Sequence, residues 1–492
     1  MMGVPLDDTW IHFQFADNFS KGSFFQFNPG EYTAGTTSPL YVIVLGTFSF
    51  ITKHFIFNSI FLSASFHFLC CLFIYRVSLI VFENNGSLFR NLNTDIYNPE
   101  TFSFLAAVLT VLNGRFAWSA LSGMETTMFT FFCILGIYFH LKNLKNDKVN
   151  LNPALFITLA TISRPEGFLL FTLYLFDLSM NLQKINKLRS EFVKIIFSVF
   201  IFLIVTVPYL FFSYKISGHF FPNTFRGQGG SFHLIPNFEY VKTGLIYFLK
   251  DNPITGILYV VSVFYYLFNL KKYFTGFRYI NLIFLWIILL PVISSVLIPN
   301  WRHHVRYLFP VIPFINLISV YTFFTVSGYD LFSKFRQYIS EKKYILYLIP
   351  VFSLVNYFIF AAALGFNTDN INSQQVKLAS WVKNNVRRNE TIAVNDIGAI
   401  GFISKNRIID MAGLITPEIL RYRTYRWDDN LDSLNYLLKK NNVAYIIIYD
   451  EWFKEYLVKY GNELTFLTSA YLDNNTICGG DEMKVYKTNF NK

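Results

Sequence analysis

Long apolar runs separated by short polar connections dominate the chain from residue 39 to residue 366. Apolar runs of this length match the hydrocarbon thickness of a bilayer, which a helix of about 20 residues crosses. Proline, serine, threonine and asparagine interrupt many of them, which is typical of helices that pack on one another. The pattern predicts an α-helical polytopic membrane protein with about ten or eleven apolar segments, at 39–57, 59–82, 122–141, 193–214, 254–270, 279–298, 305–327 and 344–366, and more weakly at 101–114, 150–163 and 166–181.

The pattern changes after Phe366, where soluble periodicities replace the apolar runs. Residues 374–388 have the spacing of an amphipathic helix, with Val376, Leu378, Ala379, Val382 and Val386 on one face. Short apolar runs predict buried strands at Thr391–Val394 and Val443–Ile448, and a helix is expected at about 432–441. We therefore expect two domains, a membrane domain at 1–366 and a small α/β domain at 367–492.

Composition and charge support a membrane protein. Only 15% of the 492 residues are charged and 53% are hydrophobic, whereas soluble domains average about 25% charged residues. The formal net charge of +11 lies almost entirely in residues 1–366, which hold 26 Lys and Arg against 16 Asp and Glu. An excess of this kind is typical of cytoplasmic loops, and no basic helix or zinc finger suggests nucleic acid as a partner.

Four short connections carry 14 Lys and Arg against 3 acidic residues, at 142–148, 184–194, 271–278 and 334–343. The positive-inside rule places them in the cytoplasm. The connections at 164–167, 215–241 and 299–304 then face outward, together with everything after residue 366. We expect a multi-pass protein of the cell inner (plasma) membrane whose C-terminal domain is extracytoplasmic.

Residues 1–38 carry four acidic residues and one lysine, which suits an outer loop. We expect a further spanning helix upstream of such a loop, to lead it across the membrane. If 115–123 is also outside, an even number of crossings must separate the two segments, yet three apolar runs lie between them. Either one run is re-entrant or lies flat, or 115–123 is on the other side.

Two consecutive carboxylates, Asp7 and Asp8, open this outer loop. Adjacent acids at a membrane surface are not both comfortably ionised without a partner. One could have a raised pKa and act as a general base, or both could hold a hydroxylated ligand or a metal ion. The structural alternative is a helix N-cap followed by a solvated turn.

The segment from Asp7 to Leu40 resembles the first outer loop of the GT-C superfamily of polyprenyl-phosphate-sugar-dependent glycosyltransferases. The greatest similarity within it is to the cell-wall terminal arabinofuranosyltransferases. Two departures are the absence of a first spanning helix and the residues Arg226-Gly227-Gln228, where a lysine often follows the motif at Phe221-Pro222-Asn223-Thr224. Further matches follow in the expected order, at Ser122-Gly123-Met124-Glu125-Thr126, Ser163-Arg164-Pro165-Glu166-Gly167, Phe221-Pro222-Asn223-Thr224, Arg306-Tyr307-Leu308-Phe309-Pro310 and from Asp396-Ile397-Gly398-Ala399 to Asp410-Met411-Ala412-Gly413-Leu414.

The resemblance implies an aspartate of the first outer loop as general base, which corresponds to Asp7 or Asp8, with Asp7 preferred. The base would deprotonate an acceptor hydroxyl, which attacks the anomeric carbon with inversion. The lipid phosphate that leaves needs positive charge and hydrogen-bond donors. The basic cluster at the outer surface that could supply them is Arg302, His303, His304 and Arg306; lipid headgroups or acidic residues are the alternative partners.

Other polar residues have open roles. Glu125, Arg164 and Glu166 lie beside apolar helices, where charges are costly; an ion pair between helices and sugar binding are equally consistent with them. Asn28 and Glu31 could shape the acceptor site, and Asn223 could either bind substrate or only form a turn. No metal site is indicated, because two adjacent histidines without a third ligand are a poor zinc signature. A divalent cation, Mg²⁺ or Mn²⁺, is compatible with the two aspartates but is not required.

The predicted function is therefore transfer of a hexosyl or pentosyl group from a polyprenyl-phosphate donor to a cell-envelope glycan, glycolipid or glycoprotein, in contact with membrane lipids. A transporter or flippase of lipid-linked saccharides is the alternative, and it predicts internal repeats, of which the sequence gives no convincing sign. A non-catalytic scaffold of an envelope complex would leave Asp7 and Asp8 without a role.

Overall fold

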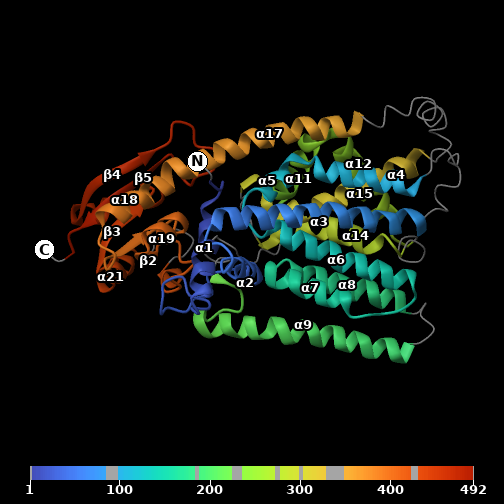
Figure 1. Cartoon of the computed structure of the whole chain (residues 1–492), viewed down its shortest axis with the longest axis horizontal. Helices are drawn as coiled ribbons and strands as arrows, with labels where there is room; N and C mark the ends of the chain where they lie inside the picture. Colours follow the sequence, from blue (N-terminus) through green and yellow to red (C-terminus); the bar gives the residue numbers. More distant parts are fainter. Residues whose placement is uncertain are drawn as a thin grey trace.

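The computed structural model describes residues 3–84, 98–182, 188–223, 235–271, 278–297, 303–327, 348–422 and 430–490. It consists of a bundle of roughly aligned helices with a small sheet domain at one end (Figure 1). The long helix α17 runs along the edge of the bundle into the sheet domain, and α1 lies between the two parts. The predicted fold class, a polytopic helical domain followed by an α/β domain, is confirmed.

Asparagine–proline pairs begin two of the bundle helices, because the asparagine side chain accepts the first free N–H groups and proline needs none. Asn98 caps α4 and Asn252 caps α12 in this way. The bundle contains α1 (Asp7–Ser20), α2 (Pro39–Phe48), α3 (Phe55–Asn84), α4 (Pro99–Val111), α5 (Gly114–Ala120), α6 (Thr126–Lys145), α7 (Asn152–Ser163), α8 (Gly167–Leu182), α9 (Leu188–Ser217), α11 (Phe238–Asp251), α12 (Pro253–Phe268), α14 (Asn281–Leu297), the 3₁₀ segment η2 (His303–Val311), α15 (Ile312–Ser327) and α17 (Leu348–Ile371).

Among the described residues, five helices are long and apolar enough to cross a membrane, and α4 with α5 forms a sixth span bent by 63°. Five shorter apolar helices accompany them. These segments correspond to the ten or eleven apolar runs that were expected. The five long spans are Phe55–Asn84, Thr126–Lys145, Glu191–Ser217, His303–Thr325 and Leu348–Asn385, and the short helices are α2, α7, α8, α12 and α14.

Helix α2 accounts for the uneven number of runs between residues 38 and 115. It has 10 residues, so it is about 15 Å long and cannot cross a hydrocarbon core of about 30 Å. The two segments that remain, α3 and the bent pair α4–α5, are long and apolar enough to span. The lengths therefore favour the alternative in which one of the three runs lies flat or is re-entrant, and the sides on which residues 1–38 and 115–123 lie stay predictions.

The C-terminal domain is a five-stranded sheet in the order β2-β1-β3-β5-β4, in which β1, β2 and β3 are parallel and the β5 pairings are antiparallel. Strands β1 and β3 and helix α21 match their predictions. Its elements are a π-helical turn (Asn372–Val376), α18 (Lys377–Asn385), β1 (Thr391–Val394), α19 (Gly398–Ser404), β2 (Arg407–Asp410), α20 (Ile419–Tyr422), α21 (Leu431–Lys440), β3 (Val443–Ile448), η6 (Asp450–Trp452), α22 (Lys454–Tyr460), η7 (Gly461–Glu463), β4 (Leu464–Tyr471) and β5 (Glu482–Thr488).

The two domains share a continuous helix and a continuous core. Helix α17 passes through the π-helical turn into α18 without a break at residue 366, so the expected boundary lies inside a helix. Helix α1 is buried from both sides. Ile11 and Phe15 belong to the core of the C-terminal domain, whereas Trp10 and Phe13 pack in a cluster with residues of α2 and α3.

Candidate active site

A cavity of about 600 Å³ lies where α1, the start of α6, the α7–α8 turn, α14 and η2 meet. This volume is within the usual range for small-molecule sites. Its lining is divided into a charged part and an apolar part. The charged part is formed by Asp8, His12, Glu125, Arg164, Glu166 and Arg306, and the apolar part includes Phe168, Leu169, Leu290, Ile293 and Leu297.

Asp8 and His12 face the cavity together because they are four residues apart on α1. The carboxylate of Asp8 accepts a hydrogen bond from Nη2 of Arg306 at 2.6 Å. Burial by itself would raise the pKa of Asp8, but the charges of Arg306 and His303 outweigh it and lower that pKa to about 2. Asp8 is therefore a firmly ionised carboxylate at the charged end of the cavity.

Asp7 faces the other way, toward the C-terminal domain. Its carboxylate accepts hydrogen bonds from the backbone N–H groups of Gly398 at 2.7 Å and Ala399 at 2.8 Å, where α19 begins. A Cβ at position 398 would lie 2.1 Å from the carbonyl oxygen of Asp7, so only glycine allows this approach. Burial, reinforced by the charge of Asp396, raises the pKa of Asp7 to about 8. Asp8, and not Asp7, is the aspartate that lines the cavity, so the position of the two side chains favours Asp8 over the preferred Asp7, and the identity of the base stays a prediction.

Arg306 is the cation at the charged end of the cavity, and it is only 6% exposed. Its Nη2 binds Asp8, but Nε and Nη1 have no hydrogen-bond partner among the described residues. Buried donors of this kind are costly unless a ligand satisfies them. The side chain is thus arranged to bind an anion through Nη1 while Nη2 keeps its bond to Asp8.

Three consecutive residues before Arg306 have left-handed backbone conformations, with φ angles of 28° at His303, 59° at His304 and 67° at Val305. Such conformations cost about 1–3 kcal/mol each in residues with a Cβ and persist where the surroundings hold them. Arg115 holds this segment: its Nη1 donates to the carbonyl of His304 at 2.7 Å, and Nε and Nη2 each bind Asp251 at 2.9 Å. The strained segment directs Arg306 into the cavity.

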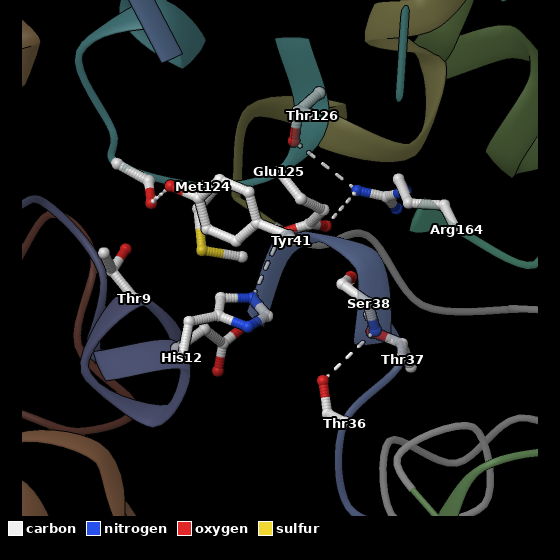
Figure 2. Close-up of polar contacts among 12 residues, drawn as sticks. Thr9, His12, Thr36, Thr37, Ser38, Tyr41, Met124, Glu125, Thr126 and Arg164 are labelled. Atoms are coloured by element: carbon white, nitrogen blue, oxygen red, sulfur yellow. Dashed lines mark hydrogen bonds and ion pairs between the residues drawn. The ribbon is translucent and has the colours of Figure 1, made fainter. Parts of the chain in front are cut away.

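A row of charged side chains crosses the cavity wall from α1 to the α7–α8 turn. Nε2 of His12 lies 3.1 Å from Oε2 of Glu125, and Nη1 of Arg164 donates to Oε1 of Glu125 at 3.0 Å. Arg164 also binds Glu166 at 2.9 Å. Figure 2 shows the imidazole of His12 and the guanidinium of Arg164 approaching the same carboxylate. Glu125, Arg164 and Glu166 therefore form the ion pairs that were one of their two expected roles. They also line the cavity, where sugar binding stays a prediction.

The segment that carries Glu125 is fixed by hydroxyl groups from three helices. Thr9 donates to the carbonyl of Ser122, Tyr41 to that of Gly123 and Ser63 to that of Met124, at 2.9, 2.6 and 2.9 Å; the Thr9 and Tyr41 side chains are visible in Figure 2. The carboxylate is consequently held in place from its backbone as well as from its ion pairs.

Other predicted site residues lie away from the cavity. Asn28 pairs through its amide with both the N–H and the C=O of Ile408 at 2.9 Å, and Glu31 binds Arg407 at 2.6 Å. Both therefore contact the C-terminal domain, and their role at an acceptor site stays a prediction. An asparagine and an acid in a glycine-containing turn are typical of a ligand-binding loop. Here the side-chain amide of Asn28 instead pairs with β2 in the way that the backbone of a neighbouring strand would.

The remaining predicted residues are divided among several places. The ring of His304 bonds to Asn367 at 3.0 Å and does not line the cavity, while the charge of His303 lowers the pKa of Asp8. Asn223 is buried and its backbone N–H bonds to the carbonyl of Ala34; its neighbours Phe221 and Pro222 line the cavity. Arg302 lies outside the described residues.

Sequence reasoning did not select His12, Arg115 or Asp251. A signal for His12 existed, since it follows Asp8 by one helical turn. No local signal connects Arg115 with Asp251, which are 136 positions apart. As for metal ions, the acidic and imidazole side chains at the cavity are Asp8, His12, Glu125 and Glu166, and each acid already faces an arginine. Within the described ranges, no three His, Cys, Asp or Glu side chains form a metal-binding group, and a bound divalent cation stays a prediction.

The C-terminal domain matches a family model described as a domain of unknown function, DUF8728, over residues 369–486. No curated protein matches the chain.

Solved structures with a similar fold cover almost the whole chain. ArnT from Cupriavidus metallidurans in the apo state is 13% identical and aligns with 97% of this chain and 92% of its own, with a TM-score of 0.60. The same protein bound to undecaprenyl phosphate aligns with a TM-score of 0.54, at 13% identity, over 97% of this chain and 93% of its own. The archaeal oligosaccharyltransferase AglB from Archaeoglobus fulgidus, in complex with an inhibitory peptide and a dolichol-phosphate, aligns with a TM-score of 0.59 at 11% identity. This alignment covers 98% of this chain and 70% of AglB. These neighbours are GT-C glycosyltransferases, and the chain has the GT-C fold.

Proposed function

We propose that this protein is a membrane glycosyltransferase that moves one sugar from a polyprenyl-phosphate donor to a cell-envelope glycan, lipid or protein. The observation that carries the proposal is Arg306, whose two N–H groups without a partner in the described structure point to an anion at the charged end of a cavity with an apolar wall. Two proteins of the same fold have been solved with undecaprenyl phosphate and with a dolichol-phosphate, which supports a donor of this class.

The donor would lie across the two parts of the cavity. Its phosphate binds Nη1 of Arg306, while Nη2 stays on Asp8, so the guanidinium holds the anion without giving up its carboxylate. The first isoprenoid units lie along the apolar wall formed by α8 and α14, where Leu169 and Ile293 are among the lining residues. The sugar then lies at the charged end, within reach of Asp8, His12 and Glu125.

The transfer forms one bond and breaks another. An acceptor hydroxyl attacks the anomeric carbon from the side opposite the phosphate, and the bond between that carbon and the phosphate oxygen breaks with inversion. The electron pair leaves with the lipid phosphate, whose charge Arg306 stabilises. The proton of the hydroxyl passes to a base in the cavity. The resemblance implies an aspartate of the first outer loop as this base, and the cavity offers two proton acceptors on α1, Asp8 and His12.

Helix α6 supports one orientation of the protein in the membrane. This helix begins beside the cavity at Thr126 and ends at Lys145, about 30 Å away, with Lys142 and Lys145 in its last turn. The cavity and this basic end therefore lie at opposite ends of the bundle. With basic loops in the cytoplasm, the cavity and the C-terminal domain docked beside it are extracytoplasmic.

The test is a transfer assay on purified protein in detergent, with a panel of polyprenyl-phosphate sugars and envelope glycans as acceptors. We expect transfer from at least one donor. Arg306→Met should weaken polyprenyl-phosphate binding by about 10- to 100-fold, because a buried charge-assisted contact is worth about 1.5–3 kcal/mol. Arg278→Met is the matched control, since Arg278 also pairs with an aspartate but lies away from the cavity.

Two results would contradict the proposal. One is unchanged binding of polyprenyl phosphate by the Arg306→Met variant. The other is binding of lipid-linked saccharides by the wild type without transfer from any donor, which would favour the transporter or flippase function.

A further inference from the structure

A histidine that the sequence motifs left without a role lies in the wall of the cavity. His12 is 6% exposed and lines the cavity one helical turn from Asp8. Its Nε2 lies 3.1 Å from Glu125, whereas its Nδ1 is buried and has no hydrogen-bond partner in the described part of the chain. Buried polar atoms are normally satisfied, so Nδ1 is available to a ligand in the cavity.

The partners of Glu125 determine which ring nitrogen of His12 carries the proton. Glu125 binds the guanidinium of Arg164 through Oε1, so it is a carboxylate and can only accept hydrogen bonds. Nε2 must therefore donate to Oε2 of Glu125. In the neutral imidazole this leaves Nδ1 with a free lone pair.

Asp8, in contrast, is already occupied. Its carboxylate holds Arg306 at 2.6 Å, and the positive charges around it lower its pKa to about 2. A carboxylate so strongly stabilised is a weak proton acceptor, because efficient general bases have a pKa near the working pH. It also keeps Nη2 of Arg306 fixed while Nη1 binds the phosphate.

We infer that His12, held by Glu125, accepts the proton of the attacking hydroxyl, and that Asp8 positions Arg306. This assignment rests on the proposed glycosyl transfer. In the step, the hydroxyl oxygen bonds to the anomeric carbon, its proton moves to Nδ1 of His12, and the lipid phosphate leaves with the electron pair of the broken bond. The imidazolium formed is stabilised by the carboxylate of Glu125 beside it. The arrangement is that of a carboxylate that orients a histidine base.

The decisive variant is His12→Gln. Glutamine can keep the N–H donor that Nε2 supplies to Glu125, but it has no nitrogen that accepts a proton. We expect kcat to fall by about 10²- to 10⁴-fold, while KM and the affinity for polyprenyl phosphate change less than about threefold. His54→Gln is the matched control, because His54 is exposed and lies away from the cavity.

Chemical rescue separates proton transfer from packing. Imidazole added to His12→Ala should restore part of the rate in the space that the ring leaves, whereas it should not restore Asp8→Asn. If His12→Gln keeps kcat within about threefold of the wild type, the inference is overturned, and a large loss in Asp8→Asn would then return the base to Asp8. Phosphate binding tests the proposed function separately from the identity of the base. If Arg306→Met loses binding of polyprenyl phosphate and His12→Gln keeps it, the proposed function stands whichever residue is the base.

Discussion

Two regions of the molecule, the cavity and the contact between the domains, meet at a single peptide bond. Asp8 faces the cavity and Asp7 faces the start of α19 in the C-terminal domain. The pKa of Asp8 is lowered to about 2, and that of Asp7 is raised to about 8. Both carry a carboxyl group on the same helical turn and both are partly buried, so the difference comes from their partners.

The partners explain the two directions. Asp8 gains a full positive charge from Arg306, whereas Asp7 gains two neutral N–H groups and faces another acid, Asp396, whose pKa burial also raises. Two neutral hydrogen bonds do not offset burial together with a nearby negative charge. The comparison teaches that a pair of adjacent acids can be divided between chemistry and assembly, and that its sequence does not reveal which acid does which.

The largest expected effect comes from replacing one acid at a time. Asp8→Asn should lower the rate of transfer by at least 100-fold, because Arg306 loses the charge that positions it. Asp7→Asn should keep the rate within about tenfold, since its amide oxygen can still accept a hydrogen bond from α19. Steady-state transfer rates on both variants, with circular dichroism to verify folding, measure the difference. Equal losses in both variants would contradict the division of roles.

The pH dependence of stability should follow Asp7. In the folded protein Asp7 keeps its proton up to about pH 8, whereas in the unfolded chain it loses it near pH 4. The folded state therefore binds more protons between these values, and stability falls as the pH rises through them, by a total on the order of a few kcal/mol. Asp8 contributes no slope in this window, because its effect is lost only below about pH 4.

Thermal unfolding from pH 5 to pH 8 checks this expectation. The melting temperature of the wild type should decrease over this range, and in Asp7→Asn the decrease should be smaller. A variant that keeps the full wild-type slope would show that Asp7 does not hold the proton.

A smaller effect is expected at the edge of the interdomain contact. Asn28→Ala removes two buried hydrogen bonds to Ile408 and should destabilise the protein by about 1–3 kcal/mol. Glu31→Gln breaks a more exposed pair with Arg407 and should cost less than about 1 kcal/mol. Neither should change KM for the donor. Melting temperatures measured side by side rank the two, and a larger shift in Glu31→Gln would reverse the argument.

Much of the membrane domain could be predicted because helices that face lipid or lie buried in a bundle are long apolar runs in the sequence. The same holds for β1 and β3, which are short apolar runs. Strand β5 was not expected, although Met483 and Val485 alternate with less buried residues as in a half-buried strand. Strand β4 gave less signal, since most of its side chains are partly or fully exposed.

The residues of the candidate site could be predicted better than the contacts between them. Asp8, Glu125, Arg164 and Arg306 were each selected from separate motifs, and the fold brings them to one cavity. Helix α1 itself was read as a loop, because its polar residues such as Gln14 and Asp17 hide its helical character and find partners only in the folded protein. Contacts such as that of Asn28 with Ile408 join residues 380 positions apart and leave no local trace.

The unbroken helix from α17 to α18 bears on how this protein could be recombined. A chimaera joined at residue 366 would cut a 38-residue helix and also separate Ile11 and Phe15 from the core that covers them. The C-terminal domain is thus not an interchangeable module. Exchange between relatives would have to move α1 with it, and so would transfer the aspartate of the cavity along with the domain that packs behind it.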